Sequence, residues 1–190
     1  MKRGFYTIIG AQFFSSLADT ALLIAAIQLL RQLADPAWME PALKQCLAAP
    51  YVLLAPLVGA FADSMPKGRA MLITNGLKIV GCVMILFGVH PLIGYAVVGI
   101  GAAAYSPAKY GILTELLPPQ QLVIANGWIE GATVGSIILG TLLGGLLISP
   151  KISTALLGFD VPLLDTGIDT PPQAAIAVIL FIYAIAASIN

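Results

Sequence analysis

The chain of 190 residues is 59% hydrophobic and only 9% charged, with a mean hydropathy of +0.96. Soluble domains carry about a quarter charged residues, so this chain has too few to cover a surface that faces water. The composition therefore predicts an integral membrane protein. The formal net charge is zero and the few Lys and Arg residues form no basic stripe, which excludes nucleic acid as a partner.

Apolar stretches long enough to cross a bilayer, which takes about 20 residues in a helix, divide the chain. They predict spanning helices over residues 5–30, 43–62, 70–89, 92–112, 122–148 and 174–190. The first stretch is too long for a signal peptide and shows no cleavage site, so we expect it to be retained. The sequence thus predicts one all-α polytopic domain over residues 1–190.

The segments between these helices indicate shape and orientation. Pro50 and Pro56 lie inside the second span and predict a bent helix. Residues 149–173 are rich in proline and aspartate, and we expect an external loop that partly rests on the membrane surface. With the N-terminus in the cytoplasm, five basic residues fall inside and two or three outside, which favours that orientation. The inner ones are Lys2, Arg3, Lys67, Arg69 and Lys109. The outer ones are Arg31 and Lys151, and Lys44 is the third if it is counted as outside the membrane.

A short polar turn joins the second and third spans. It carries Gly59, Asp63, Lys67 and Arg69 within eleven residues. Gly59 would let another helix approach closely. The two basic side chains are expected at the headgroup level of the cytoplasmic leaflet, where basic residues fix orientation.

Three ionisable residues lie within the predicted spans: Asp19, Lys78 and Glu130. A charge at membrane depth costs at least ~2.5–3.5 kcal/mol on insertion scales, so such residues are functional candidates that must face the bundle interior or a water-filled cavity. With Asn75, one turn before Lys78, they are candidates for substrate binding or charge relay. The alternative is a buried structural ion pair, for example between Asp19 and Lys78.

A second polar cluster lies at the inner end of the fourth span. It contains Tyr105, Lys109 and Tyr110, and Glu115 follows. One interpretation is a lysine that snorkels to the membrane surface between interfacial tyrosines. The other is a contact for a headgroup phosphate, or a cytoplasmic gate.

Other residues indicate packing rather than chemistry. Cys46 and Cys82 lie inside apolar runs without metal-binding or redox spacing, and His90 stands alone beside a proline. We expect no metal site, no cofactor and no catalytic residue, since hydrolase and metalloprotease motifs are absent. Five glycines in the fifth span form two sets, each with a spacing of four residues, and predict close helix packing: Gly127, Gly131 and Gly135, then Gly140 and Gly144.

Several motifs resemble known transporters. The pattern from Gly59 to Asp63, followed by a basic turn, is similar to the signature of the major facilitator superfamily, although Ser64 stands where a base is usual. The segments ADSMPKGR at 62–69, NGLK at 75–78 and GIGAAAYSPAKYGIL at 99–113, with AQF at 11–13 leading to Asp19, closely resemble the bacterial lysophospholipid transporter family, a branch of that superfamily.

The resemblance implies a fold of twelve helices in two halves, so this chain looks like the N-terminal half, with the second six-helix half absent. It implies flipping of lysophospholipids, chiefly lysophosphatidylethanolamine, to the cytoplasmic leaflet of the bacterial inner membrane by alternating access. A partner acyltransferase with acyl-carrier-protein synthetase activity would reacylate them. Asp19 would attract the ammonium group and Lys78 or Lys109 the phosphate. Asp63 would contact the second half, and we expect it to be unpaired here.

The sequence is also compatible with other functions. An efflux carrier for an amphipathic drug or small solute would share the fold. A membrane anchor or assembly domain for a cytosolic acyltransferase would need only the inner loops. An intramembrane enzyme is the weakest alternative.

Overall fold

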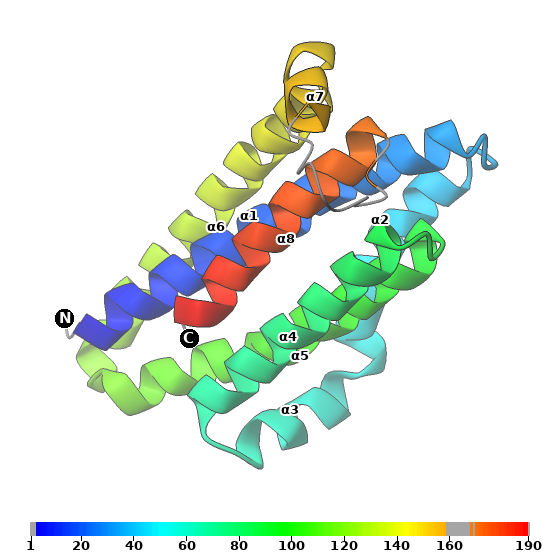
Figure 1. Ribbon diagram of the computed structural model, residues 1–190. Helices are drawn as coiled ribbons and strands as arrows, with labels where there is room; N and C mark the ends of the chain where they lie inside the picture. The colour runs from blue at the N-terminus through cyan, green and yellow to red at the C-terminus, as the bar shows by residue number, and fades with distance from the viewer. Residues whose placement is uncertain (1–2, 159–167, 169, 190) are drawn as a thin grey trace.

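The computed structural model describes residues 3–158, 168 and 170–189, and every regular element in that part of the chain is an α-helix (Figure 1). The helices are α1 (Arg3–Gln32), α2 (Met39–Leu53), α3 (Ala55–Asp63), α4 (Lys67–Leu86), α5 (Pro91–Leu116), α6 (Pro119–Ile148), α7 (Pro150–Leu157) and α8 (Pro171–Ile189). By length and composition, α1, α4, α5, α6 and α8 can each cross a membrane. The predicted all-α membrane bundle is therefore confirmed.

Helices α2 and α3 together form the bent segment that the prolines predict. They meet at Leu54 with a bend of 65°. Pro56 lies in the first turn of α3 and has no N–H to donate to the preceding turn, so the helix breaks just before it. Pro50 sits inside α2. After the bend, α3 packs against α5 at the edge of the bundle (Figure 1).

The long helices pack as two groups. Helix α1 lies along α6 and α8, while α4 lies along α5. Helix α2 also packs against α5 (Figure 1). Two apolar clusters fill the interior, one around Leu22 and Ile85 and the other around Phe5 and Met71. Along α1 and α4 most of the buried residues between these clusters are polar, so a polar layer separates the two halves of the core. They are Gln12, Ser15, Thr74, Asn75 and Lys78.

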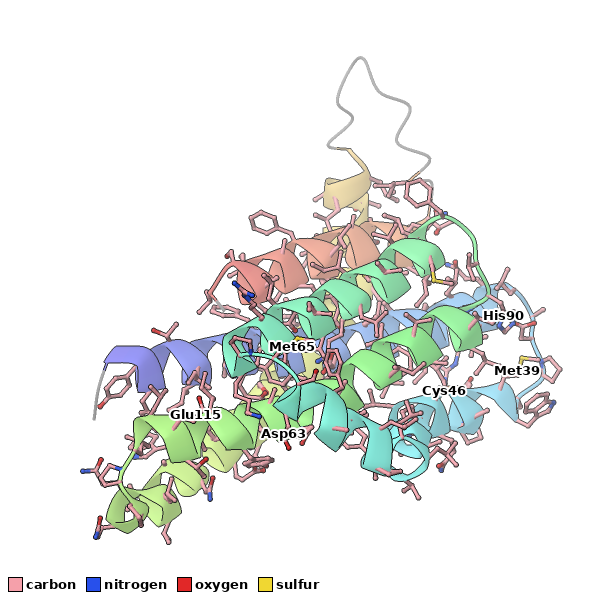
Figure 2. All side chains as sticks on the ribbon, turned by 90° about the horizontal axis from the view of Figure 1, so that it is seen from below. Met39, Cys46, Asp63, Met65, His90 and Glu115 are labelled. Atoms are coloured by element: carbon pink, nitrogen blue, oxygen red, sulfur yellow. The ribbon has the colours of Figure 1, made fainter. Side chains whose placement is uncertain are left out.

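The connections fall at the two ends of the bundle. Asp63, Met65 and Glu115 lie toward one end, and Met39 and His90 lie at the other (Figure 2). The predicted surface loop 149–173 contains the short helix α7, and residues 159–167 and 169 of that loop lie outside the described part.

Glycines allow α6 to lie directly on α1. A Cβ added to Gly140 would sit 2.6 Å from the carbonyl oxygen of Leu17, and one added to Gly144 would sit 3.1 Å from that of Ala21. The packing prediction is confirmed for these two residues. At the other three glycines of the predicted set and at Gly59 an added Cβ meets nothing within 4 Å, so no described helix of this chain packs closely there.

We therefore expect Gly140→Ala to loosen the contact between α1 and α6. The new methyl group would overlap backbone that cannot move aside, which typically costs about 1–3 kcal/mol. Gly145→Ala is the matched control, since its Cβ would have no neighbour within 4 Å. Thermal unfolding of both variants in detergent measures the difference. Equal melting temperatures for the two would contradict the close contact.

Candidate functional site

The centre of the polar layer is an ion pair between α1 and α4. Nζ of Lys78 lies 2.7 Å from Oδ2 of Asp19. The lysine side chain is 3% exposed and the aspartate side chain 15% exposed. Two charges with so little access to water are stable only as a pair, and the structure brings together Asp19 and Lys78, the two residues that the sequence suggested as an ion pair. The small exposed part of Asp19 leaves it accessible from a cavity.

Two tyrosines from other helices complete the surroundings of Asp19. The hydroxyl of Tyr183 on α8 donates to Oδ1 of Asp19 at 2.7 Å. The hydroxyl of Tyr95 on α5 donates to the backbone carbonyl of the same residue at 3.1 Å. Both tyrosines are fully buried. Neither tyrosine is among the predicted site residues, and the only signal for each in the sequence is a tyrosine in an otherwise apolar stretch, since a buried hydroxyl requires a partner.

Lys78 is held from the other side by a short chain of hydrogen bonds. Its ammonium donates to the hydroxyl of Ser15 at 2.9 Å, and that hydroxyl donates to Oδ1 of Asn75 at 2.9 Å. The ammonium also lies 5.4 Å from the ring centroid of Tyr105. Asn75 is therefore linked to Lys78 only through the hydroxyl of Ser15. Its buried amide nitrogen has no hydrogen-bond partner among the described residues.

A cavity of about 210 Å³ adjoins the ion pair. Five helices contribute to its wall, which carries one carboxylate, from Asp19, and two ammonium groups, from Lys78 and Lys109. The other residues of the wall are Gln12, Ser16, Thr20, Leu47, Tyr51, Ala102, Tyr105, Ser106, Thr133 and Ile137. The cavity therefore offers both signs of charge within an otherwise apolar bundle.

The second predicted cluster gathers around Lys109. Its Nζ lies 3.8 Å from Oε1 of Glu130 and 4.4 Å from the ring centroid of Tyr110, and the tyrosine hydroxyl donates to the same carboxylate oxygen. Lys109 is buried in the cavity wall, so the snorkelling interpretation is wrong. Glu130 was expected to face the interior, but its side chain is 54% exposed at the edge of this cluster.

The polar turn between α3 and α4 differs from the expectation for Asp63. This carboxylate pairs with the ammonium of Lys67, one helical turn later, and the same ammonium donates to the carbonyl of Ala62 at 2.9 Å. The prediction that Asp63 is unpaired was wrong, because a base at this spacing can reach it locally. Arg69 and Glu115 are exposed and have no ion-pair partner within the described residues.

The cysteines and His90, which were expected to carry no chemistry, take no part in the contacts described above. Among the described residues no three or more His, Cys, Asp or Glu side chains gather as metal ligands. Cys82 is buried and Cys46 half-buried, and both are free thiols. His90 lies at the other end of the bundle, where its Nε2 is 3.2 Å from Oδ2 of Asp35.

Membrane-length helices packed around a cavity with charged walls define a polytopic membrane bundle of the kind found in transport proteins. The profile of the Major Facilitator Superfamily matches residues 8–189, and the chain belongs to this superfamily.

Within this superfamily, the chain is similar to several curated relatives that share one name. The chain is 49% identical over 156 residues to the lysophospholipid transporter LplT of Yersinia enterocolitica, a match that covers 82% of this chain and 39% of the relative. It is 50% identical over 156 residues to the protein of the same name from Klebsiella pneumoniae, with the same coverage. The protein of that name from Cronobacter sakazakii is 49% identical over 155 residues, again covering 82% and 39%. The chain thus matches about two fifths of the length of these relatives.

Proposed function

We propose that this chain forms the N-terminal six-helix half of a transporter that moves lysophospholipids, chiefly lysophosphatidylethanolamine, to the cytoplasmic leaflet of the bacterial inner membrane. The names of the relatives support the substrate class. The observation that carries the proposal is the cavity whose wall carries the carboxylate of Asp19 and the ammonium groups of Lys78 and Lys109. A zwitterionic headgroup needs an anion and a cation to replace its lost hydration.

The proposed headgroup contacts follow from these charges. The ammonium of the lipid binds Asp19, where it competes with Lys78 for the carboxylate. Lys78 is then free to contact the phosphate together with Lys109, which lines the same cavity. Charge-assisted hydrogen bonds of this type are stronger than neutral ones. The single acyl chain remains in the apolar surroundings of the helices.

The proposed orientation places the N-terminus in the cytoplasm. The α3–α4 turn, with Lys67 and Arg69, and the inner end of α5, with Lys109 and Tyr110, then lie on the cytoplasmic side. Basic residues in short loops favour that side. Contacts at this end, including the pair of Asp63 with Lys67, would form part of a gate that opens and closes with the transport cycle.

The transport path would lie between this half and a second six-helix half, as in alternating access by rocking of two bundles. A cytosolic acyltransferase with acyl-carrier-protein synthetase activity is the proposed consumer of the product. Reacylation would trap the lipid inside, which gives transport a direction.

The function is tested in bacterial cells that lack their own lysophospholipid transporter and express the full-length gene. We expect wild type to restore conversion of added lysophosphatidylethanolamine to the diacyl lipid. Asp19→Asn removes the charge that binds the ammonium, and we expect a loss of about tenfold or more, because hydrogen bonds to charged groups contribute about 1.5–3 kcal/mol. Conversion is measured by thin-layer chromatography of labelled lipid.

Arg31→Gln is the matched control, because it removes a charge from an exposed ion pair with Glu40 at the opposite end of α1 from the inner gate. Membrane content of each variant is measured by immunoblot. Failure of wild type to restore conversion would contradict the substrate and favour an efflux carrier. Normal conversion by Asp19→Asn would contradict the site and favour the anchoring role.

A further inference from the structure

The carboxylate of Asp19 receives hydrogen bonds on both oxygens from two different helices. Lys78 on α4 donates to Oδ2 and Tyr183 on α8 donates to Oδ1, each at 2.7 Å. The two donors fix the plane of the carboxylate. They differ in one respect: Lys78 carries a charge that a ligand ammonium can replace, whereas the neutral hydroxyl of Tyr183 can stay in place when the ligand binds.

We infer that Tyr183 is a positioning residue for headgroup binding, which holds one oxygen of Asp19 while the other exchanges its partner from Lys78 to the ligand ammonium. This inference rests on the proposed function and adds a residue on α8, outside the wall of the cavity. Without Tyr183, the carboxylate of Asp19 could rotate once Lys78 gives up its hydrogen bond to the ligand. With Tyr183 in place, the second oxygen stays directed at the cavity.

The burial of Tyr183 supports this role. Its side chain is fully buried, so no water is available to its hydroxyl. A buried hydroxyl without a partner is costly, and the partner here is an ionised group, which makes the bond stronger than a neutral one. The residue also packs in the apolar cluster that contains Leu22 and Ile85, which restricts its ring. The hydroxyl is therefore held in place before any ligand binds.

Tyr95 provides an internal comparison. It is also a fully buried tyrosine whose hydroxyl donates to Asp19, but to the backbone carbonyl at 3.1 Å. That carbonyl does not take part in the exchange of partners. Loss of the Tyr95 hydroxyl removes a buried hydrogen bond near the site without freeing the carboxylate. A purely structural role for both tyrosines predicts the same effect for both hydroxyl deletions.

The test compares Tyr183→Phe and Tyr95→Phe in the full-length gene product, reconstituted in liposomes, with labelled lysophosphatidylethanolamine as the probe. For Tyr183→Phe we expect the apparent KM to rise about tenfold or more, in line with loss of a hydrogen bond to a charged group. The maximal rate should stay within about twofold, because the bond acts on binding of the headgroup. For Tyr95→Phe both values should stay within about twofold of wild type.

Thermal unfolding of both variants shows whether the fold is kept, since each substitution preserves the ring. Equal KM values for the two variants, or a fall in the maximal rate alone, would overturn the role of Tyr183. Failure of Tyr183→Phe to insert, with Tyr95→Phe inserting normally, would assign Tyr183 to folding and also overturn it. If wild type itself moves no lysophosphatidylethanolamine, the proposed function is contradicted. That result differs from failure of the Tyr183 role, because it does not depend on either variant.

Discussion

Replacing Lys78 with methionine is expected to destabilise the protein by about 3–5 kcal/mol, because it leaves the carboxylate of Asp19 buried without its counter-ion. Methionine has a similar length and removes only the charge and its hydrogen bonds. Tyr183 would remain as a partner of the carboxylate, but a neutral hydroxyl does not balance a full charge. Unfolding of the purified protein in detergent with increasing denaturant measures the loss.

The double variant Asp19→Asn with Lys78→Met is expected to recover most of this loss, since no unpaired charge remains. Its transport should stay absent, because both headgroup contacts are gone. Arg31→Met is the control for removal of a basic residue from an exposed pair, and we expect its effect to be several-fold smaller. A single variant as stable as wild type would show that the pair is not effectively buried.

The second large effect concerns residues 1–190 alone. We expect this chain, reconstituted without further sequence, to move no lysophosphatidylethanolamine above the rate of empty liposomes. Its cavity is lined from one bundle only, and α6 exposes large apolar side chains, among them Trp128 and Val134. Alternating access requires a second bundle that closes the path in turn.

The matched control for this experiment is the full-length gene product in the same liposomes, assayed with the same labelled lipid. A rate for residues 1–190 equal to that of the full-length protein would contradict a path between two halves. It would also indicate that a single bundle can move the lipid.

Much of the fold could be predicted from the sequence because membrane helices must satisfy their own backbone hydrogen bonds. The helices and the bend before Pro56 follow from this rule together with proline chemistry. The helix contacts were harder to predict. Gly140 lies at a close contact and Gly59 does not, although both are preceded by apolar residues, since the neighbouring helix at each position depends on the tertiary arrangement.

The part of the site that could be predicted is the pair of charged residues, because burying a charge has the largest energetic cost. A buried charge requires a partner, which singled out Asp19 and Lys78 and suggested their pairing. Tyr183 was missed because a tyrosine satisfies the apolar pattern of its helix, and its contact with Asp19 joins residues separated by 164 positions. The pairing of Asp63 with Lys67 could have been read from their spacing of four residues.

The most direct test of the central claim is the inward movement of labelled lysophosphatidylethanolamine in liposomes that contain the full-length gene product, with wild type and Asp19→Asn compared at equal protein content. Movement is measured as the fraction of lipid that becomes inaccessible to extraction from the outer leaflet. We expect wild type to exceed empty liposomes and Asp19→Asn to match them. Equal movement by both proteins would contradict the assignment of the cavity at Asp19 as the headgroup site.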